Sequence, residues 1–302
     1  MSSSGENSDV AASLGRLGTL SLQQGKLDTA VKHYNESLEM FVKVHGTCEH
    51  VDVASTLNNL GLIAEQQGKF NAALKYYNES FNIKVKVYGT HEHVSVANTL
   101  NNLGELARLQ ENFDAALKYY NESLDITVKM YGTHEHVDVA STLNNLGLVA
   151  EQQGKFDAAL KYYNESLDIT LKVYGTHEHV SVGRTQNNLG LVTQLQGNFD
   201  AALKYYNEAL DINVKVYGTR EHVDVARALF NMGLIAKAKG DIDDALNYGK
   251  ESYAICLKVF GSENHPDVEN VVSFMDQLKA ESKIGVSSCD TVDSGVVKMR
   301  TK

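Results

Sequence analysis

The chain has 302 residues, with a hydrophobic fraction of 43% and a charged fraction of 22%, which is typical of a folded protein. Its formal net charge of −10 at pH 7 argues against a general nucleic-acid-binding protein, because such proteins need lysine and arginine to displace counterions from phosphates. No stretch approaches the ~18 consecutive apolar residues of a bilayer-spanning helix, so we expect neither a nucleic-acid partner nor a membrane partner.

The N-terminal residues and the cysteines indicate the compartment. Residues 1–10 read MSSSGENSDV, without the basic and apolar regions of a secretory signal. The three cysteines, Cys48, Cys256 and Cys289, are odd in number and irregularly placed, which favours reduced thiols over a disulfide framework. We therefore predict a cytoplasmic protein, in which residues 1–9 are disordered.

From about residue 10 onward the sequence repeats itself with a period of 43 residues. The recurring residues include the histidines His50, His93, His136, His179, His222 and His265, and the glycines Gly18, Gly61, Gly104, Gly147, Gly190 and Gly233. We place six repeats at about residues 10–52, 53–95, 96–138, 139–181, 182–224 and 225–267.

Each repeat is predicted to form two helices, which we name helix A and helix B. In the second repeat, Asp52 is expected to be the N-cap of a helix A over 53–67, because its carboxylate can accept from free backbone amides. Gly68 and Lys69 form the turn, helix B covers 71–88, and Gly89 ends it. The third repeat has Glu111 in place of the turn glycine, so we predict a less favourable turn there.

The apolar residues of each helix lie on one face. In helix A of the second repeat, Leu57, Leu60, Gly61 and Ala64 follow helical spacing, and in helix B, Ala73, Tyr77 and Ser80 do the same. We expect Tyr77 to pack in the core between the helices. One helix pair cannot bury both apolar faces, so the pairs must stack into an all-α array.

The C-terminal residues differ from the repeats. Residues 268–282 are predicted to form a lone helix whose outer side carries Glu269, Asp276 and Lys279, and a polar outer side suits a helix that caps the stack. The small and polar residues that follow predict a flexible tail over 283–302.

The pattern Leu57, Leu60-Gly61, Gly68, Ala73, Tyr77 and Ser80 resembles the tetratricopeptide repeat. The text LNNLG and the sequence His265-Pro266-Asp267-Val268 are similar to the longer repeats of the kinesin light chain and nephrocystin type. The resemblance implies a right-handed α-α superhelical solenoid of six helix pairs plus a C-terminal capping helix. It also implies a non-enzymatic scaffold that binds a protein or peptide ligand. The alternative that it implies is a kinesin light chain-like cargo adaptor, although residues 1–9 contain no heptads for a heavy chain.

In the family, helix A lines the concave wall of the solenoid, so the resemblance implies that its asparagines face the ligand. An amide offers a donor and an acceptor, which suits the backbone of an extended peptide. The alternative is that these amides bond to the neighbouring helix. The candidate groove residues are Asn58, Asn59, Asn101, Asn102, Asn144, Asn145, Asn187, Asn188 and Asn231.

Three cations gather in the helices A of the C-terminal half: Arg184, Arg227 and Lys237. A positive inner patch on an acidic protein predicts an acidic peptide or a C-terminal carboxylate as ligand. The alternative is ordinary solvated charge.

The sequence holds no pattern of a catalytic or cofactor site. It contains no phosphate-binding loop, no G-x-S-x-G and no dinucleotide fingerprint, so we predict no enzymatic activity and no cofactor. The HEH triplets, such as His91 to His93, offer too few converging ligands for zinc, so we predict a structural role in the linkers and no metal.

Overall fold

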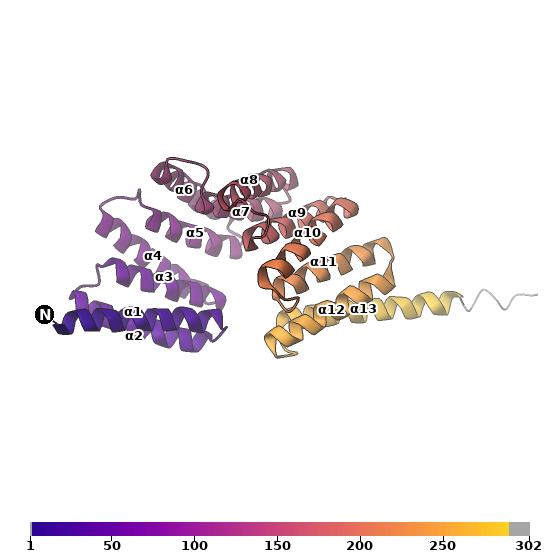
Figure 1. Ribbon diagram of the computed structural model, residues 1–302, viewed down its shortest axis with the longest axis horizontal. Coiled ribbons are helices and arrows are strands. Elements are labelled where there is room, and N and C mark those ends of the chain that lie inside the picture. Colours follow the sequence, from indigo (N-terminus) through magenta and orange to yellow (C-terminus); the bar gives the residue numbers. More distant parts are fainter. Residues whose placement is uncertain (1, 290–302) are drawn as a thin grey trace, which may run out of the picture. The chain divides into compact units, whose positions relative to one another are not determined.

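The computed structural model describes residues 2–289, and the side chains of residues 7–281. These residues form thirteen α-helices and no strand, and the chain divides into two compact units, residues 1–162 and residues 163–302 (Figure 1). Unit 1 holds α1 (Ser2–Gln23), α2 (Leu27–His45), α3 (Val51–Gln66), α4 (Phe70–Tyr88), α5 (Val94–Leu109), α6 (Phe113–Tyr131), α7 (Val137–Gln152) and the first turns of α8 (Phe156–Tyr174). Unit 2 holds the rest of α8, α9 (Val180–Leu195), α10 (Phe199–Tyr217), α11 (Val223–Lys239), α12 (Ile242–Phe260) and α13 (Pro266–Cys289).

The helices follow the predicted order of six A–B pairs and one terminal helix, which confirms the all-α fold class. Within unit 1 each helix from α1 to α7 packs against the next, and helices A of consecutive repeats also touch, as α3 with α5 and α5 with α7. Unit 2 shows the same scheme from α9 to α13, with α9 touching α11. None of the helices in the described part is long and apolar enough to cross a bilayer.

Histidine, and not aspartate, caps helix A, so our prediction that Asp52 is the N-cap was wrong. Helix α3 begins at Val51, and the Nδ1 atom of His50 accepts a hydrogen bond from the Asp52 amide, with an N···N distance of 3.2 Å. The sequence reasoning considered only the usual oxygen-bearing capping residues. The same histidine caps the helix at His93, His136, His179 and His222, and His265 accepts from the Asp267 amide.

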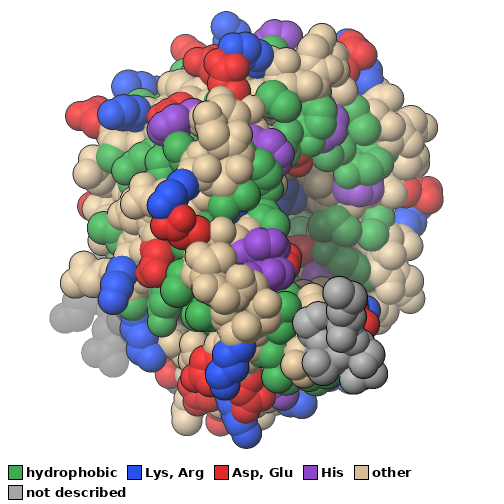
Figure 2. Space-filling view, turned by 90° about the vertical axis from the view of Figure 1, so that its left-hand side faces the viewer, with side chains coloured by type: hydrophobic (Ala, Val, Ile, Leu, Met, Phe, Trp, Pro, Cys, Tyr) green, Lys and Arg blue, Asp and Glu red, His purple; other side chains and the backbone are tan. Residues whose placement is uncertain are grey.

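Each capping histidine also stacks on an aromatic ring at the end of the preceding helix B. The ring centroids are 3.4–3.6 Å apart in His45–His50, Tyr88–His93, Tyr131–His136, Tyr174–His179, Tyr217–His222 and Phe260–His265. On the face shown in Figure 2, histidine side chains lie next to hydrophobic ones. The second histidine of each HEH triplet therefore has a structural role, as the sequence predicted. In the first repeat His45 replaces the tyrosine, and its Nε2 atom lies 3.1 Å from the Asp52 carboxylate.

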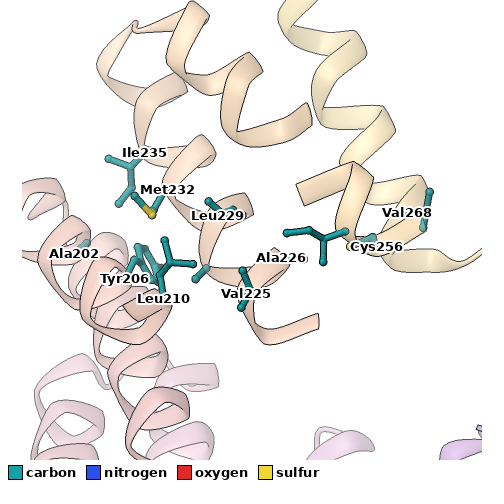
Figure 3. Close-up of a cluster of buried hydrophobic side chains, with 12 residues drawn as sticks. Ala202, Tyr206, Leu210, Val225, Ala226, Leu229, Met232, Ile235, Cys256 and Val268 are labelled. Carbon is teal, nitrogen blue, oxygen red and sulfur yellow. The ribbon is translucent and has the colours of Figure 1, made fainter. Parts of the chain in front are cut away.

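The core of each repeat is built where helix B approaches a glycine of helix A. Tyr77 and Tyr120 are fully buried, and their rings lie against Gly61 and Gly104, which leave no room for a Cβ atom. This confirms Tyr77 as a core residue. In unit 2 the corresponding Tyr206 belongs to a hydrophobic cluster that includes Leu229 and Met232 of α11 (Figure 3).

The turns between helix A and helix B require a left-handed backbone. Gly68 has a φ of 70°, and Glu111 adopts a φ of 58° at the corresponding position. A side chain in this region costs about 1 kcal/mol or more, because Cβ crowds the backbone. This confirms the less favourable turn that the sequence predicted for the third repeat.

Glu111→Gly is therefore expected to stabilise the protein by about 1 kcal/mol, since glycine adopts this conformation without crowding. Urea denaturation followed by circular dichroism measures the change. The reverse substitution, Gly68→Glu, should destabilise the protein by a similar amount, and a loss of stability in Glu111→Gly would contradict the argument.

The first and last helices are longer than predicted. Helix α1 begins at Ser2, whereas we had expected disorder over residues 1–9, and Met1 lies outside the described residues. No proline interrupts these residues, so the helix that packs from Ala11 onward can continue toward the N-terminus. Helix α13 starts with Pro266 and reaches Cys289, beyond the predicted end at 282. Residues 290–302 of the predicted tail lie outside the described residues.

Candidate protein-binding surface

The first asparagine of each helix A pair lies in the contact between consecutive repeats. The Asn101 amide donates to the Ser123 hydroxyl of α6 and to the Thr142 hydroxyl of α7, both at 2.9 Å. Asn144, at the same position of the next repeat, is 3% exposed. The Asn101 side chain therefore joins three helices, which is the alternative that the sequence left open, and Asn144 is buried at the same position.

The second asparagine of each pair reaches back to the preceding helix A. The Asn102 amide donates to the Asn58 carbonyl oxygen at 3.0 Å, and in unit 2 the Asn231 amide donates to Asn187 at 3.2 Å. The remaining members of this column, Asn59, Asn145 and Asn188, are half-buried. Their contact with a ligand stays a prediction.

Of the three predicted cations, two have acidic neighbours. Arg227 Nη1 lies 3.1 Å from the Asp224 carboxylate, and Lys237 Nζ lies 3.0 Å from that of Glu281. Arg184 is exposed and makes no ion pair with any residue whose side chain the structure describes. Arg184 and Arg227 both lie close enough to Tyr217 to act on its titration.

The Tyr217 phenol is the group on which these charges act. Burial, and then its hydrogen bond to Asp224 at 2.8 Å, raise the pKa of Tyr217 to about 12, and the charges of Arg184 and Arg227 oppose the rise. The charges of Arg184 and Arg227 thus both act on the Tyr217 phenol, whereas Lys237 is paired with Glu281 of α13.

A cavity of about 80 Å³ lies between α11, α12 and α13, and the sequence reasoning missed it. Its walls are apolar at Ala226, Phe230 and Val271, and Arg227, Asn270 and the Asp267 carboxylate supply polar groups. A space of this kind can receive one aliphatic side chain of a ligand, and the Arg227 guanidinium can pair with a carboxylate of the same ligand.

The cavity arises where the first asparagine of the helix A pair is replaced by another residue. Phe230 stands where Asn101 stands in the third repeat, and Val271 stands where Thr142 does. The Phe230 ring packs edge-on against Phe274, with centroids 5.3 Å apart. The space that Asn101 fills in unit 1 is therefore left open above Ser252 and Cys256. The replacement of asparagine by phenylalanine was the sequence signal that could have revealed the cavity.

In unit 1 the helix A surface carries a network of two carboxylates, one guanidinium and two phenols. The Tyr120 hydroxyl donates to Glu105 at 2.9 Å, and Arg108 pairs with the same carboxylate at 2.6 Å. The Tyr77 hydroxyl donates to Glu65 at 3.2 Å. Burial, and then the charge of Glu105, raise the pKa of Glu65 to about 7, because both disfavour its ionised form.

Glu65→Gln is expected to stabilise the protein above pH 7 by about 1 kcal/mol, a value reduced for the partial exposure of the carboxylate. The folded-state pKa of Glu65 is raised, so the wild type loses stability as the pH rises from about 4.5 to about 7. Gln194, in the corresponding place of repeat five, accepts from Tyr206 at 2.8 Å and shows that glutamine fits. Thermal unfolding from pH 4 to pH 8 measures the difference, which should vanish at the acid end. A constant difference across this range would contradict the assignment.

Comparison with known proteins agrees with this architecture. The sequence pattern of the tetratricopeptide repeat matches residues 9–86, 95–172 and 181–258. No curated protein matches the chain.

Similar solved structures share the fold at low sequence identity. BtubC (BKLC) from P. vanneervenii is 21% identical with a TM-score of 0.59, over 86% of this chain and 94% of that chain. A Podospora anserina putative kinesin light chain with nearly identical TPR-like repeats is 19% identical with a TM-score of 0.55, over 71% of this chain and 100% of that one. A chain of the APC/C hetero-tetramer Cut9-Hcn1 is 17% identical with a TM-score of 0.62, over 89% of this chain and 42% of that one.

The helix pairs, the glycine–tyrosine contacts and the matched repeat pattern agree with one another. Tetratricopeptide repeats mediate contacts between proteins, and the chain belongs to the tetratricopeptide repeat family.

Proposed function

We propose that this chain is a non-enzymatic scaffold that acts in the cytoplasm and binds an extended segment of a partner protein along its helix A surface. The observation that carries the proposal is the open cavity of unit 2, with Arg227 in its wall and the unpaired Arg184 in the same electrostatic neighbourhood. An aliphatic side chain beside a carboxylate is the chemistry that this combination accepts. The ligand is therefore an acidic segment that carries an aliphatic residue.

The half-buried asparagines extend the same surface. Asn188 and Asn231 lie on helices α9 and α11, which touch each other in unit 2. Their amide side chains are of the type that can bind a peptide backbone, while the cavity and the cations supply selectivity. Binding should weaken as salt is added, because the carboxylate contact is exposed.

The test is peptide binding by fluorescence anisotropy, with an acidic peptide that contains one leucine and the same peptide with serine instead. Arg184→Glu should weaken binding of the leucine peptide about tenfold or more. Arg220→Glu is the matched control. Arg220 is also exposed, but it lies in the linker before α11 and pairs with Glu251 of α12. Cys256→Leu, which fills the cavity, should remove the preference for leucine over serine.

Equal weakening by Arg184→Glu and Arg220→Glu would show that only net charge matters, and would overturn the proposed site. Unchanged binding in both Arg184→Glu and Cys256→Leu would place the ligand on another surface. Circular dichroism of each variant separates a loss of binding from a loss of folding.

The second candidate function is that of a kinesin light chain-like cargo adaptor. It is favoured by the likeness of fold to the putative kinesin light chain described above. A cargo adaptor must hold its peptide and a motor subunit at the same time. Co-sedimentation of the chain with a kinesin heavy chain, with and without the acidic peptide, distinguishes an adaptor from a scaffold of another kind.

A further inference from the structure

Helix α1 exposes an apolar stripe at the N-terminal end of unit 1. Val10, Leu17 and Leu20 are 47%, 47% and 50% exposed, and Ser13 lies exposed between them. We name these four residues the N-terminal stripe. They occupy positions i, i+3, i+7 and i+10, which lie on one face of a helix.

The same four positions are buried in the repeats that follow in unit 1. None of the corresponding side chains in repeats two, three and four is more than 5% exposed. In repeat two, Val53 packs with Phe41 of α2, and Leu60 and Ile63 pack with Ala30 and Tyr34 of the same helix. The residues in those repeats are Val53, Thr56, Leu60 and Ile63, then Val96, Thr99, Leu103 and Leu106, then Val139, Thr142, Leu146 and Val149. The N-terminal stripe thus has the residue pattern of a packing face, and none of the residues whose side chains the structure describes covers it as α2 covers the stripe of repeat two.

The C-terminal helix of unit 2 is built differently. Helix α13 buries Val268, Val271 and Leu278, and its exposed side carries Glu269 and Asp276 among other polar residues. A terminal helix with a polar outer side keeps a repeat array soluble and monomeric at that end. The exposed side of helix α1 carries Val10, Leu17 and Leu20 beside polar residues such as Asp9 and Arg16, and exposed apolar faces of this kind mark interaction sites.

We propose that the N-terminal stripe is a self-association face, which a second copy of the chain covers with its own α1 in antiparallel orientation. Two copies of a chain with a net charge of −10 repel each other, so the contact between them must avoid further charge. None of the four residues of the stripe is ionisable, which meets this requirement. The Ser13 hydroxyl already donates to the Asp9 carbonyl oxygen at 2.8 Å, so its burial leaves no unpaired donor.

The spacing of the stripe also suits a twofold contact. In an antiparallel pair centred on Gly15, Val10 lies opposite Leu20 of the second copy, and Ser13 lies opposite Leu17. A small side chain therefore meets a large one at the centre, as in packed helix pairs, and each contact occurs twice, as an isologous interface requires. Two copies of Asp9 would lie about 18 Å apart along the pair, whereas two copies of the exposed Arg16 would lie about 3 Å apart along it, beside the stripe.

The first test is sedimentation equilibrium of the full chain over a wide range of concentration. The mass should rise from that of one chain toward twice that value, and added salt should strengthen the dimer by screening the repulsion. Leu17→Glu should hold the chain monomeric at all concentrations. Leu109→Glu, at an exposed leucine of α5 away from the end, should leave the dimer intact.

A wild-type chain that stays monomeric at every concentration would overturn the proposal and leave the stripe to a different protein. A Leu17→Glu variant that dimerises as the wild type does would also overturn it. Thermal unfolding of each variant verifies that the repeats remain folded.

The second test determines the relative orientation of the two α1 helices. It uses disulfide trapping in a chain that carries Cys48→Ser and Cys289→Ser. An equal mixture of Val10→Cys and Leu20→Cys chains should form covalent dimers, because these positions face each other. Val10→Cys alone should not, since two copies of residue 10 would lie about 15 Å apart along an antiparallel pair, beyond the reach of a disulfide. Efficient trapping of Val10→Cys alone would overturn the antiparallel contact.

Discussion

Substitution of Gly104 by alanine should destabilise the protein by about 2 kcal/mol, although the same change in an exposed helix usually stabilises it. A Cβ atom on Gly104 would lie 2.7 Å from Cε1 of Tyr120, which is closer than non-bonded carbon atoms approach. The Tyr120 ring is fully buried and its hydroxyl is bonded to Glu105, so it cannot move aside. Denaturation by urea measures the loss.

Gly15→Ala is the matched control for this prediction. Gly15 also lies inside a helix A, but the nearest atom to its Cβ would be the Ser37 hydroxyl at 3.5 Å, an ordinary contact. This variant should gain about 0.5–1 kcal/mol from the better helix propensity of alanine. If both variants shift stability in the same direction, the close approach of tyrosine to glycine does not control the packing.

Arg108→Gln is expected to cost about 2–3 kcal/mol at neutral pH, because it leaves Glu105 without its cation. Arg108 is 12% exposed, and its guanidinium lies 2.6 Å and 2.8 Å from the two Glu105 oxygens. Burial raises the pKa of Glu105, but the hydrogen bond and charge of Arg108 outweigh burial and hold the pKa below its usual value. The Glu105–Arg108 pair thus stabilises the wild type above pH ~4.5, and this stabilisation is lost in acid. The difference between variant and wild type should shrink accordingly as the pH falls.

The double variant Glu105→Leu/Arg108→Gln tests the same pair by removing the carboxylate together with the cation. It reproduces Leu191 and Gln194 of repeat five, where the tyrosine hydroxyl bonds to the glutamine. Its stability should lie within about 1 kcal/mol of the wild type, since no carboxylate is left unpaired at that position. A double variant as unstable as Arg108→Gln alone would show that Arg108 acts through its packing and not through its charge.

Much of the fold could be predicted from the sequence because the period of 43 residues repeats the same physical constraints. The apolar spacing around Leu60 and Tyr77 gave the two helices of each repeat, and the turn at Glu111 was recognised because glycine is expected there. The polar residues of α13, such as Glu269, indicated a terminal helix. All of these follow from local geometry, which a single repeat contains.

The candidate site was harder to predict, because it depends on contacts between repeats. Spacing places Asn101 on helix A but does not say that Ser123 and Thr142 lie within reach of its amide. The capping role of His50 was missed because its ring must first be held by His45 of the preceding helix. The cavity beside Phe230 required knowledge of which way that ring turns, and only the packed structure supplies it.

The regular bonds between repeats have a consequence for how the chain acquires its structure. Consecutive repeats are joined by hydrogen bonds between residues 37 to 44 positions apart, from Lys86–Glu49 to Asn102–Asn58. In a chain of 302 residues such contacts give a low contact order, so little loop entropy is lost before each bond forms. Every helix pair can therefore fold as soon as its neighbour is present. During synthesis, the array should grow in the direction of translation, one pair at a time.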